Sequence, residues 1–382
     1  AALTDLARGL AAARAEGTAP PPAHVETVAR RAGLEADPAA SRPYGNEAQG
    51  ERAGLEAGPA ASRPYARDVP RLAFLVPDRS GLPGLDRYAM LRWPDGTRRV
   101  TGYTEASRGC RHRCRHCPIV PIYDGRFRIV PPEVVLADID AQVAAGARHI
   151  TFGDPDFFNG PTHALRVADA LHARHPDVTW DVTIKVEHLL QQQAHLATLA
   201  RSGCAFVTSA IESLDDRVLA LLAKGHTRAD VARAVEAGGE AGLALSPTFV
   251  AFHPWQTLEA YCDWLEALES LGLAESVAPI QFSIRLLLPE GSRLLGLDDV
   301  RAVTRGFDAG SLSHTWVHRD PRVDGLQREV AALVGRRAAA PRGAVFDAVR
   351  QLARETAGLP PVSSAPRISR AAVPYLDEPW YC

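Results

Sequence analysis

The sequence feature that most constrains the fold of this 382-residue chain is a regular alternation of strand-like and helix-like segments. Short runs of apolar and β-branched residues predict strands, and longer amphipathic runs between them predict helices. The predicted strands are 148–152, 178–184, 204–211, 243–252 and 280–287, and the predicted helices are 131–146, 162–175, 187–201, 214–223, 228–240 and 258–271. Strands that alternate with helices form a parallel sheet with right-handed crossovers. With one more strand before residue 110, the pattern predicts an α/β fold of six βα units. The generic alternative is a closed barrel with a full set of eight units.

Segments before the alternation predict an N-terminal extension. Residues 1–20 predict an amphipathic helix, and the stretch 31–44 recurs at 52–65 with one residue changed. A solenoid needs at least three repeats, so this Pro/Gly/Ala-rich pair is interpreted as a duplicated linker. Residues 88–101 predict a hairpin around a Pro-Asp-Gly turn. We therefore predict an extension of helix, linker repeat and hairpin over 1–95.

The C-terminal part predicts a second extension. Residues 297–357 predict two or three amphipathic helices, and a Pro-rich extended tail follows them. The predicted domains are thus the N-terminal extension, a barrel over 96–295, and C-terminal helices with a tail over 296–382.

Three of the six cysteines lie within eight residues, as Cys110, Cys114 and Cys117. A disulfide framework spreads its cysteines over a small secreted chain, so clustered thiols in a large chain indicate a metal. Three thiolates leave one iron of a four-iron cluster open to a non-protein ligand, and an open position is typical of catalytic sites. The alternative is a structural zinc site of the three cysteines with His112 or His116.

The CxxxCxxC spacing is the signature of the radical S-adenosylmethionine (SAM) superfamily, and the surroundings resemble that superfamily too. The segment from Glu212-Ser213 to Lys224-Gly-His-Thr is similar to the oxygen-independent coproporphyrinogen oxidase and methylthiotransferase branches. The resemblance covers roughly residues 100–295. It implies an open partial (β/α)6 TIM-like barrel in place of a closed one.

The resemblance also implies the cofactors. Cys110, Cys114 and Cys117 are expected to hold a [4Fe-4S] cluster whose open iron chelates the amino and carboxylate groups of SAM. In the superfamily an electron from the reduced, oxygen-sensitive cluster cleaves SAM to methionine and a 5′-deoxyadenosyl radical. An external one-electron reductant, such as ferredoxin or flavodoxin, is the expected partner.

Further site residues are expected where the barrel strands end, because α/β barrels collect their chemistry there. The residues predicted to contact SAM are His116, Gly153, Asp154, Pro155, Asp156, Glu212, Ser213 and Arg285. Lys185, which also follows a strand, is predicted to act in catalysis by pairing with the SAM carboxylate or an anionic substrate. Plain alternatives are a helix cap for the aspartates, a solvated ammonium for Lys185 and an outward orientation for Arg285.

The chain ends on Cys382, in a tail that resembles a radical SAM subgroup with Cys-Cys or Cys-selenocysteine followed by Ala-Glu-Pro. Cys382 is therefore a candidate catalytic residue that binds substrate, holds a second metal or cluster, or acts as a redox thiol. The alternative is an idle thiol at a terminus. Cys204 and Cys262 are expected to be small core residues.

Composition narrows the function. The 43 Lys and Arg against 45 Asp and Glu argue against a protein that coats nucleic acid. No apolar run approaches the ~20 residues of a membrane span and no signal-peptide pattern is present, so we expect a soluble, cytoplasmic protein. The sequence predicts a radical SAM enzyme that modifies a small molecule, in natural-product or sulfur, selenium or arsenic metabolism. The alternatives are modification of tRNA or a peptide, and a non-catalytic zinc or iron–sulfur protein.

Overall fold

The computed structural model describes residues 72–93, 95–361 and 373–377. By its contacts the chain divides into residues 1–61 and 62–382, and every described residue belongs to the second unit. The predicted N-terminal helix, the repeated linker and Cys382 therefore lie outside the described residues. The predicted domain boundaries stay predictions.

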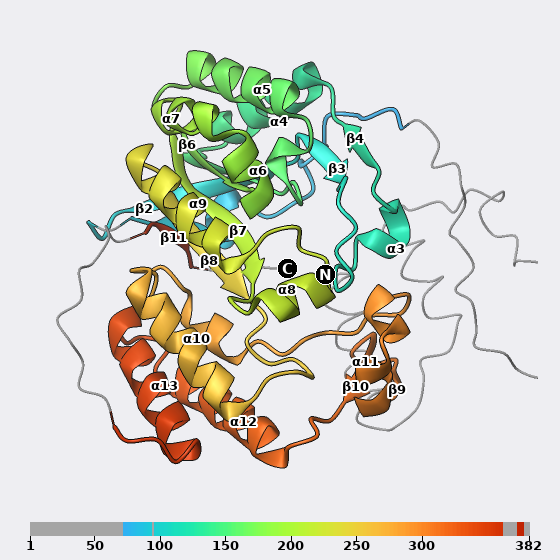
Figure 1. The fold of residues 1–382 in the computed structure, drawn as a ribbon. Helices are drawn as coiled ribbons and strands as arrows, with labels where there is room; N and C mark the ends of the chain where they lie inside the picture. The colour runs from blue at the N-terminus through green and yellow to red at the C-terminus, as the bar shows by residue number, and fades with distance from the viewer. Residues whose placement is uncertain (1–71, 94, 362–372, 378–382) are drawn as a thin grey trace, which may run out of the picture. The chain divides into compact units, whose positions relative to one another are not determined.

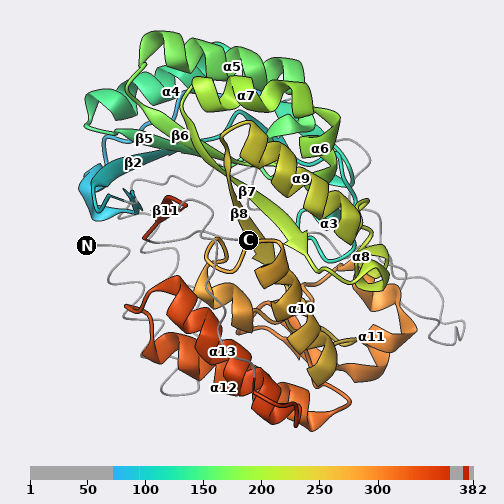
Figure 2. The ribbon, with the colours of Figure 1, turned by 60° about the vertical axis from the view of Figure 1, so that its left-hand side comes forward.

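A curled sheet of seven strands, in the order β11-β1-β2-β5-β6-β7-β8, forms the centre of the fold (Figure 2). The strands are β1 (Met90–Arg92), β2 (Arg98–Thr104), β5 (His149–Phe152), β6 (Thr179–Thr183), β7 (Cys204–Glu212), β8 (Ala244–Phe249) and β11 (Tyr375–Leu376). The five from β2 to β8 are parallel, and β1 and β11 add to the edge in antiparallel pairs. The predicted partial barrel and the predicted hairpin of β1 and β2 are confirmed.

Helices follow the parallel strands and cover one face of the sheet, except α8 (Asp216–Leu222), which lies at the strand ends and packs in a separate apolar cluster (Figure 1). They are α4 (Pro132–Ala144), α5 (Pro161–Arg174), α6 (Val186–Gln191), α7 (Gln193–Arg201), α8, α9 (Arg228–Glu240) and α10 (Leu258–Ser270). Their starts follow local chemistry: α4 and α5 begin with proline, whose fixed φ suits the first turn, and Thr227 forms a capping box with Asp230. The single helix predicted over 187–201 is wrong, because Gln192 at φ −111° separates α6 from α7.

The sixth predicted strand, 280–287, is wrong. Pro279–Ser283 forms a 3-10 helix, η3, and one parallel bridge between Phe252 and Arg285 remains at the sixth position. The reason lies in a side chain, because Gln281 Oε1 accepts a hydrogen bond from Phe249 N at 2.8 Å. The edge of β8 is thus satisfied by an amide side chain rather than by a neighbouring strand.

The C-terminal part contains the predicted helices and one hairpin that the sequence analysis missed. Its elements are η4 (Arg293–Gly296), α11 (Asp298–Val303), β9 (Thr304–Asp308), β10 (Ser313–Trp316), α12 (Pro321–Arg336) and α13 (Arg342–Thr356). The tail then returns to the sheet, where Leu376 pairs with Leu91. Asp377 secures it by ion pairs with Arg92 and Arg98.

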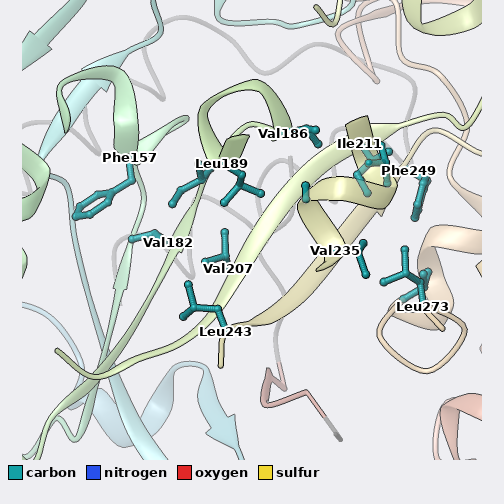
Figure 3. Packing of buried hydrophobic residues seen from close by; sticks show 14 of the residues in the cluster. Phe157, Val182, Val186, Leu189, Val207, Ile211, Val235, Leu243, Phe249 and Leu273 are labelled. Carbon is teal, nitrogen blue, oxygen red and sulfur yellow. The ribbon is translucent and has the colours of Figure 1, made fainter. Parts of the chain in front are cut away.

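The largest apolar core lies between the sheet and its helices. Figure 3 shows Val182 and Val207 of the sheet beside Val186 and Leu189 of α6, all of them buried. Burying a side chain of this size contributes roughly 1.5–3 kcal/mol. Because strand residues alternate, Asp181 lies on the opposite face from Val182. None of the helices in the described part of the chain is long and apolar enough to cross a membrane.

Candidate active site

The cysteine loop leaves the sheet immediately after β2. A short strand β3 (Ser107–Gly109) leads into Cys110, and the loop ends in a four-residue helix, α3 (Val120–Tyr123). A further strand, β4 (Phe127–Ile129), then pairs back on β3. The loop is therefore held between a short two-stranded sheet and the C-terminal end of the barrel strands.

The three thiols of this loop suit a metal centre. Cys110, Cys114 and Cys117 are all free, and Cys114 is buried. Burial, together with the neighbouring Asp156, Cys114 and Cys117, raises the pKa of Cys110 to about 12. Burial also raises the pKa of Cys117. Thiols in such surroundings lose their protons when a cation takes them as ligands, and soft sulfur donors select iron–sulfur clusters or zinc.

Asn159, at the end of the 3-10 helix η2 (Phe157–Asn159), holds the start of the loop. Its Nδ2 donates to the carbonyl of Gly109 at 3.1 Å, and its Oδ1 accepts from the amide of Arg111 at 3.0 Å. These two residues flank Cys110, so one buried amide fixes the backbone on both sides of the first thiol.

Arg115 attaches the middle of the loop to the C-terminal end of α8. Its amide donates to Leu222 O at 2.9 Å, and its Nη1 donates to Ala220 O and Leu221 O. A cationic side chain at a helix C-terminus satisfies carbonyls that have no partner within the helix. The loop thus has one anchor on the β5 side and one on the β7 side.

Glu212, at the end of β7, forms the charged side of the site. Its carboxylate lies 3.1 Å from His116 Nε2 and 3.5 Å from Lys224 Nζ. Burial raises the pKa of Glu212, but the attraction of Lys224 and His116 outweighs it and lowers the pKa to about 2. At φ +73° the residue also adopts the left-handed conformation that non-glycine residues rarely take. The end of β7 therefore keeps an ionised carboxylate beside His116, the residue that precedes the third thiol.

On the other side of the loop, His112 meets residues that follow β5 and β6. Its Nε2 lies 3.2 Å from His188 Nε2 and 3.5 Å from Asp156 Oδ2. Its Nδ1 lies 3.1 Å from Lys185 Nζ, and Lys185 in turn pairs with Glu187 at 3.0 Å. The predicted residues Asp156 and Lys185 are thus brought together by a histidine of the cysteine loop.

The first part of the predicted turn after β5 supports the loop structurally. Asp154 accepts from Ala106 N at 2.8 Å and from Ser107 Oγ at 2.6 Å. Gly153 is packed so closely that a Cβ there would lie 1.7 Å from the hydroxyl of Tyr103. Asp154 therefore joins the turn, which includes Pro155, to the segment that leads into β3.

The structure places the remaining predicted residues as follows. Ser213 is buried beside Glu212, and its hydroxyl accepts from Asp215 N at the start of α8. Arg285 lies apart from the loop contacts: it ion-pairs with Asp324 at 2.6 Å and stacks over the Trp316 ring, 3.5 Å from the ring centroid. Cofactor contact by Arg285 stays a prediction that these contacts do not favour.

Sequence reasoning did not assign Asn159, Arg115, Lys224 and His188 to this site, and it considered His112 only as a ligand of the alternative zinc site. One signal pointed to two of them, because the chain holds only two lysines and two asparagines in an arginine-rich background. No pattern in the sequence marks His188, whose role arises only from its position beside the cysteine loop.

The comparison with family models decides what this arrangement is. The model of the radical SAM superfamily matches residues 104–268, from the end of β2 to α10. Residues 104–268 form a radical SAM domain. That superfamily uses a [4Fe-4S] cluster and SAM, and the three free thiols of the CxxxCxxC loop fit the cluster.

Two curated relatives share part of this domain. A tRNA-2-methylthio-N(6)-dimethylallyladenosine synthase of Desulfosudis oleivorans is 29% identical over 207 residues, which cover 52% of this chain and 44% of that protein. The ribosomal protein uS12 methylthiotransferase RimO of Geobacter sulfurreducens is 33% identical over 92 residues, which cover 22% of this chain and 20% of that protein. The chain spans less than half the length of both relatives.

A solved structure shares the fold. The cobalamin-dependent S-adenosylmethionine radical enzyme OxsB superposes with a TM-score of 0.53 at 15% identity, over 62% of this chain and 41% of that one. At this identity the likeness shows the partial barrel alone. The membership of the tail subgroup stays a prediction.

Proposed function

We propose that this radical SAM domain is catalytically active and cleaves SAM reductively at a [4Fe-4S] cluster held by Cys110, Cys114 and Cys117. The observation that carries the proposal is Glu212, a buried carboxylate kept ionised at the end of β7, whose partner His116 precedes the third thiol. When bound and reduced, the cluster supplies the electron that cleaves a C–S bond of SAM. An external one-electron reductant then has to reduce the cluster for each cleavage.

The protein's own task is to orient SAM beside the thiols. We propose that Glu212 accepts hydrogen bonds from the ribose hydroxyls, because a carboxylate accepts from two donors at once. His116 offers a flat ring next to the third thiol, and Ser213 fixes the turn that follows Glu212. On the β5 side, the backbone of Gly153 and Pro155 is proposed to face the amino group, since the Asp154 carboxylate already accepts two hydrogen bonds.

For Lys185 we propose an electrostatic role toward an anionic group. It is buried at the end of β6 and pairs with Glu187, which is one-third exposed. A carboxylate of SAM or of the substrate can replace Glu187 as the ion-pair partner of the Lys185 ammonium, so that the net charge of the pair does not change. The tail cysteine, Cys382, remains a proposed substrate or metal ligand outside the described residues.

The proposed substrate is a small molecule, which is supported by the near-zero net charge of −2. The second candidate is a tRNA or a ribosomal protein, and it is favoured by the names of the two curated relatives. The two candidates predict different products, because only the second adds a chemical group to a tRNA or a protein and so raises its mass.

Anaerobic reconstitution of the full chain with iron and sulfide tests the proposed cleavage. We expect about four irons per chain and release of 5′-deoxyadenosine from SAM with dithionite. Cys114→Ala should abolish both, whereas Cys204→Ala, which removes a buried thiol outside the loop, should retain both. Methylthioadenosine as product would assign cleavage to the other C–S bond, and bound zinc without SAM cleavage would refute the enzymatic proposal.

A further inference from the structure

Two histidines and one aspartate meet beside the cysteine loop without belonging to the thiol set. They are His112 in the loop, Asp156 after β5 and His188 in α6, and one ligand atom from each lies within 4.8 Å of the others. His112 Nε2 lies 3.2 Å from His188 Nε2 and 3.5 Å from Asp156 Oδ2. Ligand atoms bound tetrahedrally to one ion at zinc-like distances stand about 3.4 Å apart. The spacing therefore suits one shared cation.

Two buried atoms of this cluster contact each other without forming a well-aligned hydrogen bond. Asp156 and His188 each have side chains that are only 2% exposed, and Asp156 Oδ2 lies 2.7 Å from His188 Nδ1. Neither atom has a hydrogen-bond partner of acceptable geometry among the described residues. Buried polar atoms without partners are rare in folded proteins and indicate a missing ligand. A cation would supply that partner to Asp156, and His188 would offer it one nitrogen only, because its Nε2 faces His112 and its Nδ1 faces Asp156.

The charges around the cluster also accommodate a cation. Lys185 Nζ lies 3.1 Å from His112 Nδ1 and, as an ammonium, can only donate to it, so binding of a cation by His112 Nε2 requires the ammonium to leave Nδ1 and stay with Glu187. The charge of Lys185 is opposed by Glu187, whose carboxylate lies 3.0 Å from the ammonium and 3.7 Å from His112 Nδ1. Ligand imidazoles are commonly oriented by a carboxylate behind the ring, and Glu187 lies where such an acceptor is needed.

We propose that His112, Asp156 and His188 bind one divalent transition-metal ion, separate from the iron–sulfur cluster. Two imidazoles and one carboxylate leave coordination positions open, which is typical of catalytic rather than structural sites. The ion would act as a Lewis acid toward an oxygen or nitrogen atom of a substrate at the strand ends. That use rests on the proposed function, whereas the binding of the ion does not. The proposal assigns Asp156 to the metal instead of to SAM.

Zinc binding to the cluster-free full chain tests this site. In a chain with Cys110, Cys114 and Cys117 all changed to serine, competition with a chromophoric chelator reports Zn²⁺ affinity without interference from the thiol loop. We expect about one Zn²⁺ per chain, bound about a hundredfold more weakly after His188→Ala. Asp156→Asn should weaken binding too while it keeps the Oδ1 acceptor that caps Phe158 N at 3.2 Å.

His175→Ala is the matched control, because His175 also lies 2.7 Å from an aspartate, Asp140, but has no second imidazole beside it among the described residues. It should leave the affinity unchanged. Equal Zn²⁺ affinity in the His188, Asp156 and His175 variants, or no stoichiometric binding at all, would overturn the proposal. Neither result bears on SAM cleavage by the cluster-loaded protein, so failure here and failure of the proposed function are distinguishable.

Discussion

The β7 and β5 ends of the barrel present acidic residues to the same loop, yet they shift the pKa values of these residues in opposite directions. At the β7 end, burial raises the pKa of Glu212, but Lys224 and His116 lower it to about 2. At the β5 end, burial raises the pKa of Asp154 to about 7, because its partners are an amide and a hydroxyl and no cation is among the groups that shift it. Residue type and position in the barrel are alike, so the neighbours decide which carboxylate is kept as a charge.

The difference separates two tasks. An ionised carboxylate at the β7 end is ready to accept hydrogen bonds from a ligand. The carboxyl of Asp154 is instead used to hold Ala106 and Ser107, which lead into β3 and the thiols. Asn159 extends this supporting role to both sides of Cys110. The β5 end up to Asp154 thus builds the loop, and the β7 end faces what the loop binds.

The largest effect is expected when the charge at the β7 end is removed. Glu212→Gln leaves the ammonium of Lys224 buried without a counter-charge, which costs about 3–5 kcal/mol when one partner of a buried pair is lost. Urea unfolding at neutral pH measures the loss. Asp299→Asn is the control, because Asp299 and its partner Arg319 are both exposed and loss of this pair should cost clearly less. Equal losses of unfolding free energy in the two variants would contradict the prediction that the Glu212–Lys224 ion pair is buried and therefore costly to break.

Glu212 should also make the free energy of unfolding depend on pH in the acid range. Because the pKa of Glu212 is depressed from 4.5 to about 2 in the folded state, its contribution is present above pH 4.5 and is lost as the pH falls toward 2. The free energy of unfolding should fall over this window in the parent protein and fall less in Glu212→Gln. A slope that does not change in the variant would contradict the assignment.

A double substitution sharpens the comparison. Lys224→Met removes the ammonium but retains most of the side-chain volume, so that Glu212→Gln with Lys224→Met leaves no unpaired charge. We expect the double variant to be more stable than the sum of the two single losses predicts, with a coupling of about 1–3 kcal/mol. Additive losses would mean that the 3.5 Å contact between the two side chains contributes nothing.

At the β5 end the largest effect should come from Asn159. Asn159→Ala leaves the carbonyl of Gly109 and the amide of Arg111 without their partner, at a cost of about 1–3 kcal/mol. The cluster should also be lost faster to an iron chelator, followed by its visible absorbance. Gln351→Ala, which removes an exposed amide of α13, should change neither quantity. If the variant is less stable but loses the cluster no faster than the parent, Asn159 does not hold the backbone around Cys110 in the cluster-bound protein.

The sequence predicts those features of the site that depend on residues close together in the chain. The order of strands, the position of the cysteine loop and the strand-end location of Glu212 and Asp154 follow from local periodicity and spacing. The partners do not: Asn159 bonds to Arg111 across 48 residues, and no local pattern contains that pairing. The prediction of a sixth strand is wrong for the same reason, because the amide of Phe249 donates to the side chain of Gln281, which lies 32 residues away in the sequence.

The smallest effect is expected at Asp154, and its sign is opposite to that at Glu212. Because the folded-state pKa is raised from 3.8 to about 7, the stabilising contribution is full below pH 3.8 and is lost as the pH rises through 7. The substitution Asp154→Asn imitates the protonated form and still accepts from Ala106 N. The variant should lie within about 1 kcal/mol of the parent near pH 6 and lose less stability by about pH 8. Glu105, the one acidic group that raises this pKa further, gives the control, since Glu105→Gln should reduce the slope only slightly. An equal change of stability between those two pH values in the parent and in Asp154→Asn would show that Asp154 is already ionised, and the contrast between the two ends of the barrel would then be lost.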